Sequence, residues 1–231
     1  MGPHRFQPLE FARLPVDDMR ERAGRFLDTM RTRRSVRAFS SEPIPLDVVR
    51  RCIEAACQAP SGAHKQPWTF ALVTSPELKR RIRLAAEEEE RRTYGERMSD
   101  EWREALAPLG TTWQKPFLET APALIVMLRR DWEILPDGRR RKNYYVQESC
   151  GIALGFLIAA LHHAGLATLT HTPSPMGFLA RILERPPNEK AFMLLPVGYP
   201  AADAEVPVLE RRPLADSLVE YAATTETETA P

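Results

Sequence analysis

Apolar residues recur at helical spacing in four stretches of the chain. Residues 16–31 read as an amphipathic helix in which Met19, Phe26, Leu27 and Met30 should contact the core. Residues 46–56 repeat this spacing until Pro60 ends the run, and residues 76–90 are helical and highly charged. Residues 146–165 form the longest and most apolar of the four helices. We expect this last helix to lie in the core or at a dimer interface.

Short apolar runs between these helices predict strands. Residues 122–128 are continuously apolar, which is typical of a strand buried on both faces. Residues 69–73 have the length and β-rich composition of a central strand, and residues 166–170 and 191–197 supply two more. A polar segment, residues 129–142, contains the turn Pro136-Asp137-Gly138. Helices that alternate with short buried strands predict an α+β fold, in which helices flank a mixed β-sheet.

Composition restricts the class of protein. The 231 residues suit one domain, predicted over residues 1–221, and residues 222–231 are polar, repetitive and predicted to be disordered. A net charge of +1 gives no reason to expect a nucleic-acid or membrane partner. Three cysteines without a CxxC pair favour a reducing compartment, and no apolar run is long enough to span a bilayer. We therefore expect a cytoplasmic protein, and we find no residue spacing that indicates a metal site.

Two short motifs carry candidate chemistry. Arg33-Arg34-Ser35-Val36-Arg37 places three guanidinium groups and a hydroxyl within five residues, which suits a phosphate monoester. Ala59-Pro60-Ser61-Gly62-Ala63-His64 follows a helical run, where backbone amides become free to approach a ligand. Taken singly, the first motif is more often a solvated basic turn than a phosphate site.

Together, in this order and at this distance along the chain, the two motifs resemble the N-terminal flavin-binding motifs of the nitroreductase superfamily. Further segments make the chain similar to the iodotyrosine deiodinases, which are FMN-dependent reductive dehalogenases within it. These segments are residues 63–70, residues 90–94, Trp113-Gln114-Lys115 and Leu195-Pro196-Val197-Gly198-Tyr199-Pro200. The likeness covers residues 14–218. It implies a nitroreductase-like fold and an intertwined homodimer with two FMN sites at the subunit interface, here without the membrane anchor of vertebrate deiodinases.

The resemblance assigns residues to the cofactor FMN. The phosphate and the adjoining ring edge would be held by Arg33, Arg34, Ser35 and Arg37, with Arg211 closing on the phosphate. Alternatively, Arg211 solvates the C-terminal turn. The ring system would be bordered by Pro60, Ser61 and Gly62 of the partner subunit, and by Thr170, His171 and Thr172.

Thr172 matches the catalytic hydroxyl that hydrogen-bonds the flavin N5, a contact that favours one-electron steps over hydride transfer. His171 stands where the family has a threonine. Its imidazole could titrate near neutral pH, and its role is open.

The resemblance also assigns residues to the substrate. Glu90 would accept from the ammonium of an amino acid, Lys115 would pair with its carboxylate, and Tyr94 would add a hydrogen bond. Ala63 would offer its backbone N–H to a phenolate oxygen. Without the resemblance, the acidic run around Glu90 would be a solvated helix face. These residues belong to a predicted lid, residues 87–115, that we expect to order when ligand binds.

Three functions follow as hypotheses. The first is reductive dehalogenation of halogenated tyrosines, 3-iodotyrosine to tyrosine plus iodide, by stepwise one-electron transfer. The second keeps FMN in an NAD(P)H-dependent nitroreductase or a quinone or flavin reductase, which superfamily membership supports equally. The third is a non-catalytic binder of tyrosine-like ligands. The electron donor could be NAD(P)H directly or a separate reductase, since no G-x-G-x-x-G fingerprint is present.

Overall fold

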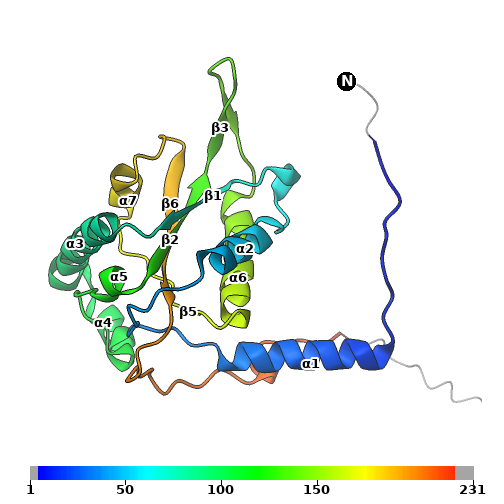
Figure 1. Cartoon of the computed structure of the whole chain (residues 1–231), viewed down its shortest axis with the longest axis horizontal. Helices are drawn as coiled ribbons and strands as arrows, with labels where there is room; N and C mark the ends of the chain where they lie inside the picture. The colour runs from blue at the N-terminus through cyan, green and yellow to red at the C-terminus, as the bar shows by residue number, and fades with distance from the viewer. Residues whose placement is uncertain (1–4, 222–231) are drawn as a thin grey trace, which may run out of the picture.

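The computed structural model describes residues 5–221, and its centre is a four-stranded antiparallel sheet. The strand order is β1 (Trp68–Val73), β2 (Ala123–Arg130), β6 (Glu189–Gly198) and β5 (Ala167–Thr168) (Figure 1). A two-stranded hairpin, β3 (Trp132–Ile134) and β4 (Arg140–Lys142), projects beyond the sheet. The predicted boundaries of β2 and β6 agree with these strands to within two residues.

Strand β2 supplies side chains to a core on each face of the sheet. Ile125 and Met127 pack in a cluster with α2 (Leu46–Cys57) and α6 (Val146–His163). Leu124 and Val126 point to the other face, toward α3 (Pro76–Arg92), α5 (Phe117–Thr120) and α7 (Gly177–Ile182) (Figure 1). Because successive strand residues alternate between faces, a strand covered on both sides must be apolar throughout. The α+β class is confirmed.

The sheet differs from the predicted one in two details. Strand β1 was predicted to be central, but it lies at one edge of the four-stranded sheet. The parallel element of the predicted mixed sheet is an isolated bridge between Ser35 and Thr168, in which the Val36 N–H donates to the Thr168 carbonyl over 3.1 Å. This bridge attaches the basic motif of residues 33–37 to strand β5.

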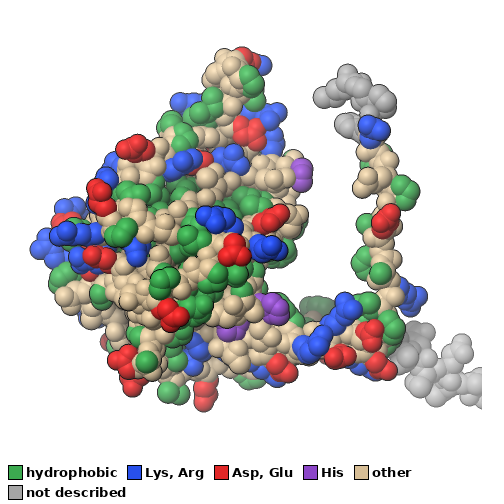
Figure 2. Space-filling view, in the orientation of Figure 1, with side chains coloured by type: hydrophobic (Ala, Val, Ile, Leu, Met, Phe, Trp, Pro, Cys, Tyr) green, Lys and Arg blue, Asp and Glu red, His purple; other side chains and the backbone are tan. Residues whose placement is uncertain are grey.

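Helix α1 (Val16–Thr32) forms where it was predicted, but its predicted core contacts are wrong. None of its residues is buried, and Phe26 and Leu27 are 57% and 50% exposed. The helix contacts α6 near its C-terminal end, where Nε2 of His162 lies 2.9 Å from the Thr29 carbonyl oxygen. From there α1 runs away from the sheet, and residues 5–15 continue outward (Figure 1), so that both project from the body of the molecule in the space-filling view (Figure 2). An apolar helical face was correctly predicted, but nothing within the described chain covers it.

The segment between α3 and α5 is largely helical. It contains one turn of π-helix (Thr93–Arg97), α4 (Asp100–Leu106) and a 3₁₀ turn (Ala107–Leu109). Ser99 caps α4 by accepting a hydrogen bond from the Trp102 N–H over 3.2 Å. Within residues 5–221, no helix has the length and apolarity needed to cross a bilayer. The tail predicted to be disordered, residues 222–231, lies outside the described residues.

Candidate active site

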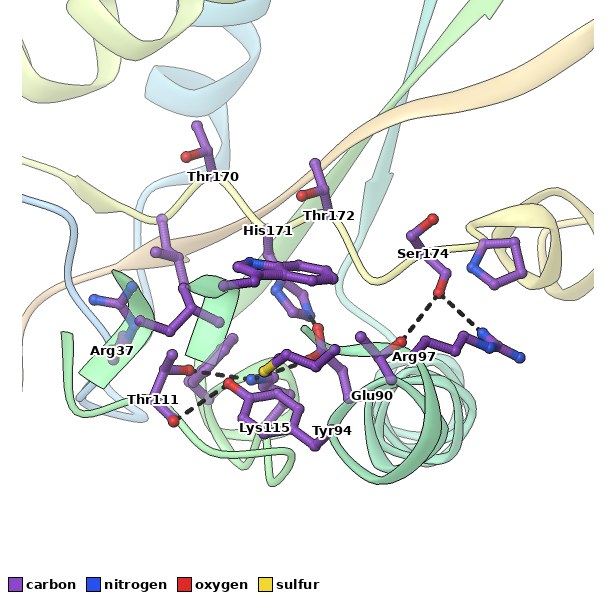
Figure 3. A pocket seen from close by; sticks show the side chains of 17 residues that line it. Arg37, Glu90, Tyr94, Arg97, Thr111, Lys115, Thr170, His171, Thr172 and Ser174 are labelled. Atoms are coloured by element: carbon purple, nitrogen blue, oxygen red, sulfur yellow. Dashed lines mark hydrogen bonds and ion pairs between the residues drawn. The ribbon is translucent and has the colours of Figure 1, made fainter. Parts of the chain in front are cut away.

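A cavity of about 360 Å³ opens between residues 90–117, which run from the C-terminal end of α3 into α5, and residues 169–175 (Figure 3). Seven of the residues that the sequence assigned to cofactor or substrate line it: Arg37, Glu90, Tyr94, Lys115, Thr170, His171 and Thr172. They come from segments up to 135 residues apart. The fold therefore brings most of the predicted substrate residues and part of the predicted FMN site to one place.

Glu90 and Lys115 form a buried pair in this cavity. Oε2 of Glu90 lies 3.6 Å from Nζ of Lys115, and their side chains are 14% and 4% exposed. Burial raises the pKa of Glu90, and burial lowers the pKa of Lys115; in each case the opposite charge of the other residue counteracts the shift. The Lys115 ammonium also donates to the Thr111 hydroxyl over 3.2 Å and to the Thr112 carbonyl. Each buried charge is thus balanced by the other.

Tyr94 connects the beginning of the segment 87–115 to its end. Its hydroxyl donates to the Thr111 carbonyl over 3.3 Å, and its ring centroid lies 5.6 Å from Nζ of Lys115. Burial raises the pKa of the Tyr94 phenol. The side chain is therefore a neutral hydrogen-bond donor beside the Glu90–Lys115 pair.

His171 lies beside this pair. Its backbone N–H and carbonyl both bond to Leu194 of β6, over 2.9 and 3.1 Å, and its ring meets Phe117 edge-to-face at 5.6 Å. Burial, with the charges of Lys115 and Arg37 close by, lowers the pKa of His171 to about 3. The ring is therefore neutral, and its 3.9 Å approach to Oε1 of Glu90 is not an ion pair. In Figure 3 the ring points toward Glu90 and Lys115, whereas the side chains of Thr170 and Thr172 lie on the opposite side of the segment.

The four arginines that the sequence assigned to the FMN phosphate divide into two groups. Within residues 5–221, the side chains of Arg33 and Arg37 make no hydrogen bond or ion pair. Arg34 donates to the Pro207 carbonyl, and Arg211 donates to the carbonyls of Arg31 and Arg33 over 3.3 and 2.9 Å. Arg34 and Arg211 therefore hold the C-terminal segment against the motif and leave two guanidinium groups available to an anion.

Ser35 and Thr170 border a second hollow of about 270 Å³ beside the cavity. Arg33, Ile158 and Thr168 complete its lining. The hollow lies where the Ser35–Thr168 bridge joins the motif to β5, so a ligand phosphate near Arg33 would lie close to Thr170.

Residues 60–63 do not join the cavity within this chain. The Ser61 hydroxyl accepts from the Gln66 N–H over 2.9 Å, and the Gly62 N–H donates to the Ser149 hydroxyl over 3.2 Å. Ala63 has a φ of 49°, and His64 and Gln66 share this left-handed conformation. Such backbone is unfavourable for residues with a side chain and is enriched at ligand sites. The Pro60–Ala63 part of the predicted site is therefore spatially separate from the rest.

Several apolar residues of the cavity were missed in the sequence. Met98, Trp102, Leu106 and Phe117 belong to its lining. The first three recur at intervals of four, which is the spacing of one helical face. That spacing could have indicated an apolar wall contributed by the lid.

Comparison with known proteins identifies relatives that span most of the chain. The nitroreductase family model matches residues 30–199. The iodotyrosine deiodinase of Haliscomenobacter hydrossis is 55% identical over 216 residues, which cover 94% of this chain and 97% of that protein. Iodotyrosine deiodinase 1 of Mus musculus is 44% identical over 213 residues, covering 92% and 75% of the two chains.

Solved structures of nitroreductase-family proteins are also similar to this chain. An oxidised iodotyrosine deiodinase bound to FMN and 3-iodo-L-tyrosine has a TM-score of 0.74 and 29% identity, covering 85% of this chain and 98% of that one. A nitroreductase with bound FMN from Bacteroides fragilis has a TM-score of 0.61 and 21% identity, over 85% and 98% of the two chains. The second likeness is one of fold alone.

Proposed function

This chain belongs to the nitroreductase family and, within it, to the iodotyrosine deiodinases, and we propose that it reductively dehalogenates halogenated tyrosines with FMN as cofactor. The net reaction converts 3-iodotyrosine to tyrosine: the carbon–iodine bond breaks, two electrons and one proton are taken up, and iodide leaves. NAD(P)H or a separate reductase supplies the electrons. Residues 1–221 act as one FMN-binding domain, with residues 87–115 as its lid.

The buried Glu90–Lys115 pair is the observation that carries this proposal. A zwitterionic amino acid can enter between these side chains, with its ammonium against Glu90 and its carboxylate against Lys115. When the ligand's two charges replace the Glu90–Lys115 contact, both buried charges keep a partner. The replacement therefore avoids the cost of leaving a buried charge unpaired. A ligand with only one of the two charges leaves either Glu90 or Lys115 uncompensated. A reductase of nitroarenes or quinones has no use for such a pair.

The chain's residues fit FMN. Arg33 and Arg37 have uncommitted guanidinium groups that suit a phosphate, and Ser35 adds a hydroxyl beside them. Thr170 and Thr172 present their side chains away from the buried His171 ring (Figure 3). When bound, FMN supplies reducing electrons one at a time to the substrate. Thr172 offers a hydroxyl donor to the cofactor, which is the role proposed for it as the catalytic residue.

The remaining part of the site comes from a second copy of the chain. Residues 60–63 line no part of the cavity in their own chain, although the Ala63 N–H is proposed to bind the substrate phenolate. Apolar side chains on α1 and α6 are open for such contact: Phe26, Leu27, Ile152 and Phe156 are 43–57% exposed. Large exposed apolar residues on neighbouring helices are typical of an interface between subunits. A homodimer would cover them and complete two sites.

The proposal is tested anaerobically on protein loaded with FMN and chemically reduced. With 3-iodotyrosine added, tyrosine and iodide should accumulate over many turnovers. Glu90→Gln should lower kcat/KM about a hundredfold, because removing one partner of a buried charge pair costs about 2–5 kcal/mol. Glu88→Gln is the matched control, since Glu88 lies on the same helix and pairs with Arg91 and Arg92 at the surface.

Reduction of a nitroarene by the same proteins distinguishes the rival function. It should fall far less in Glu90→Gln than dehalogenation does, because a nitroarene carries no ammonium. Equal loss of both activities would contradict the role of the pair. Binding of 3-iodotyrosine without iodide release would identify a binder, and rapid nitroarene reduction without 3-iodotyrosine binding would identify a nitroreductase.

A further inference from the structure

His171 has a buried polar atom that the function proposed above does not use. Its ring belongs to a residue only 7% exposed, and its Nε2 has no hydrogen-bond partner among the described residues. Leaving a buried polar atom unpaired costs about 1–3 kcal/mol. Oε1 of Glu90, an acceptor that faces this atom, lies 3.9 Å away, which is too far for a hydrogen bond. The contact between the two side chains is therefore incomplete in this structure.

Lys115 accounts for the position of Glu90. The Lys115 ammonium approaches the opposite oxygen, Oε2, at 3.6 Å, so the carboxylate lies between an ammonium on one side and a neutral imidazole on the other (Figure 3). A ligand carboxylate without an ammonium leaves Lys115 with Glu90, because Glu90 would otherwise be a buried charge without a partner. A zwitterionic ligand draws Lys115 away with its own carboxylate and places its ammonium beside the Glu90 carboxylate instead. The carboxylate is then free to move about 1 Å toward the imidazole, which would bring the two atoms within hydrogen-bond distance.

A neutral donor suits this position better than a cation. The charged groups near the ring are Lys115, Arg37 and Glu90, and the packing partner Phe117 is uncharged. The two cations oppose protonation of the imidazole. A neutral N–H can orient the Glu90 carboxylate without cancelling its charge, so the full negative charge is left for a ligand ammonium.

We propose that His171 is a positioning residue for the substrate: its Nε2–H donates to Oε1 of Glu90 once a ligand separates Glu90 from Lys115, and so selects ligands that carry an ammonium group. This inference rests on the proposed function, since it requires an α-amino acid in the cavity. It assigns the histidine to recognition of the amino-acid end of the substrate.

Two substitutions separate this role from packing. His171→Phe keeps an aromatic ring against Phe117 but has no N–H. His171→Gln has a side-chain amide whose N–H can occupy the place of Nε2–H. Each is compared with the parent protein, loaded with oxidised FMN, by following the change in flavin fluorescence on titration with ligand. The ligands are 3-iodotyrosine and 3-(4-hydroxy-3-iodophenyl)propionate, which lacks the ammonium.

His171→Phe should raise the Kd of 3-iodotyrosine about tenfold or more, which is the loss expected for a hydrogen bond to a charged group. His171→Gln should retain most of the affinity. The Kd of the propionate should be the same within about twofold in all three proteins. In a Glu90→Gln background, His171→Phe should have little further effect, because the two residues act through one contact.

Three results would overturn the inference: equal weakening of both ligands by His171→Phe, no change in either Kd, or a loss in His171→Gln as large as in His171→Phe. If His171→Phe does not fold or does not hold FMN, His171→Asn replaces it. The shorter amide of Asn cannot reach the Nε2 position, so the Kd of 3-iodotyrosine should rise in His171→Asn as it does in His171→Phe. Parent protein that fails to bind 3-iodotyrosine would overturn both the inference and the proposed function, whereas normal binding with unchanged variants would overturn the inference alone.

Discussion

Replacing His171 by Gln should make the stability of the protein less sensitive to acid. In the folded chain, burial and two nearby cations lower the pKa of His171 from 6.5 to about 3. The unfolded chain therefore binds a proton at this residue below pH 6.5, while the folded chain does not until about pH 3. Folding then requires that proton to be released, so the free energy of unfolding falls as the pH drops through this range.

The size of the effect follows from the two pKa values. Each pH unit below 6.5 costs at most about 1.4 kcal/mol for one proton, so acidification from pH 7 to pH 5 removes about 2 kcal/mol per chain through His171. Gln cannot titrate, so the variant loses none of this free energy of unfolding. All other ionisable groups are shared by the two proteins, and their contributions cancel in the comparison.

Urea unfolding followed by circular dichroism measures this difference. Parent and His171→Gln are unfolded at pH 7 and at pH 5, at one protein concentration because an associating protein gains stability with concentration. The parent should lose about 2 kcal/mol more than the variant between the two pH values. Equal losses would mean that folding does not lower the pKa of His171. The description of the imidazole as buried and neutral would then be wrong.

Three further substitutions, with a fourth as a control, test the cofactor site and the packing. Arg33→Ala should raise the Kd of FMN about tenfold to a hundredfold in a fluorescence titration, and that of riboflavin hardly at all, because only FMN has a phosphate; equal losses would refute a phosphate contact. Gly62→Ala should cost about 1–3 kcal/mol and lower Tm, since its Cβ would lie 2.7 Å from Cδ2 of Tyr145. Gly24→Ala, with no atom within 4 Å of the new Cβ, is its control and should be neutral or stabilising. Leu157→Ala should cost about 2–5 kcal/mol in urea unfolding, because Leu157 is fully buried.

Local sequence patterns were sufficient for most of the helices and strands. The continuous apolar run of β2 and the apolar helix α6 were predicted because their patterns reflect burial directly. The same patterns could not tell what covers a given face. Helix α1 has the predicted apolar stripe, yet none of its residues is buried, and β1 lies at the edge rather than the centre of the sheet. Sheet order and helix docking depend on contacts between distant segments, which periodicity does not contain.

The residues of the candidate site were identified in the sequence through a family resemblance, and the structure brings seven of them together at one cavity. Only the tertiary structure could show that Glu90 and Lys115 neutralise each other, that the His171 imidazole points toward them, and that Pro60–Ala63 do not line the same cavity. These facts depend on where α3, the lid and the segment after β5 meet in space. The sequence determined which chemical groups are available, and the long-range packing decided which of them face one another and how strongly burial shifts their charges.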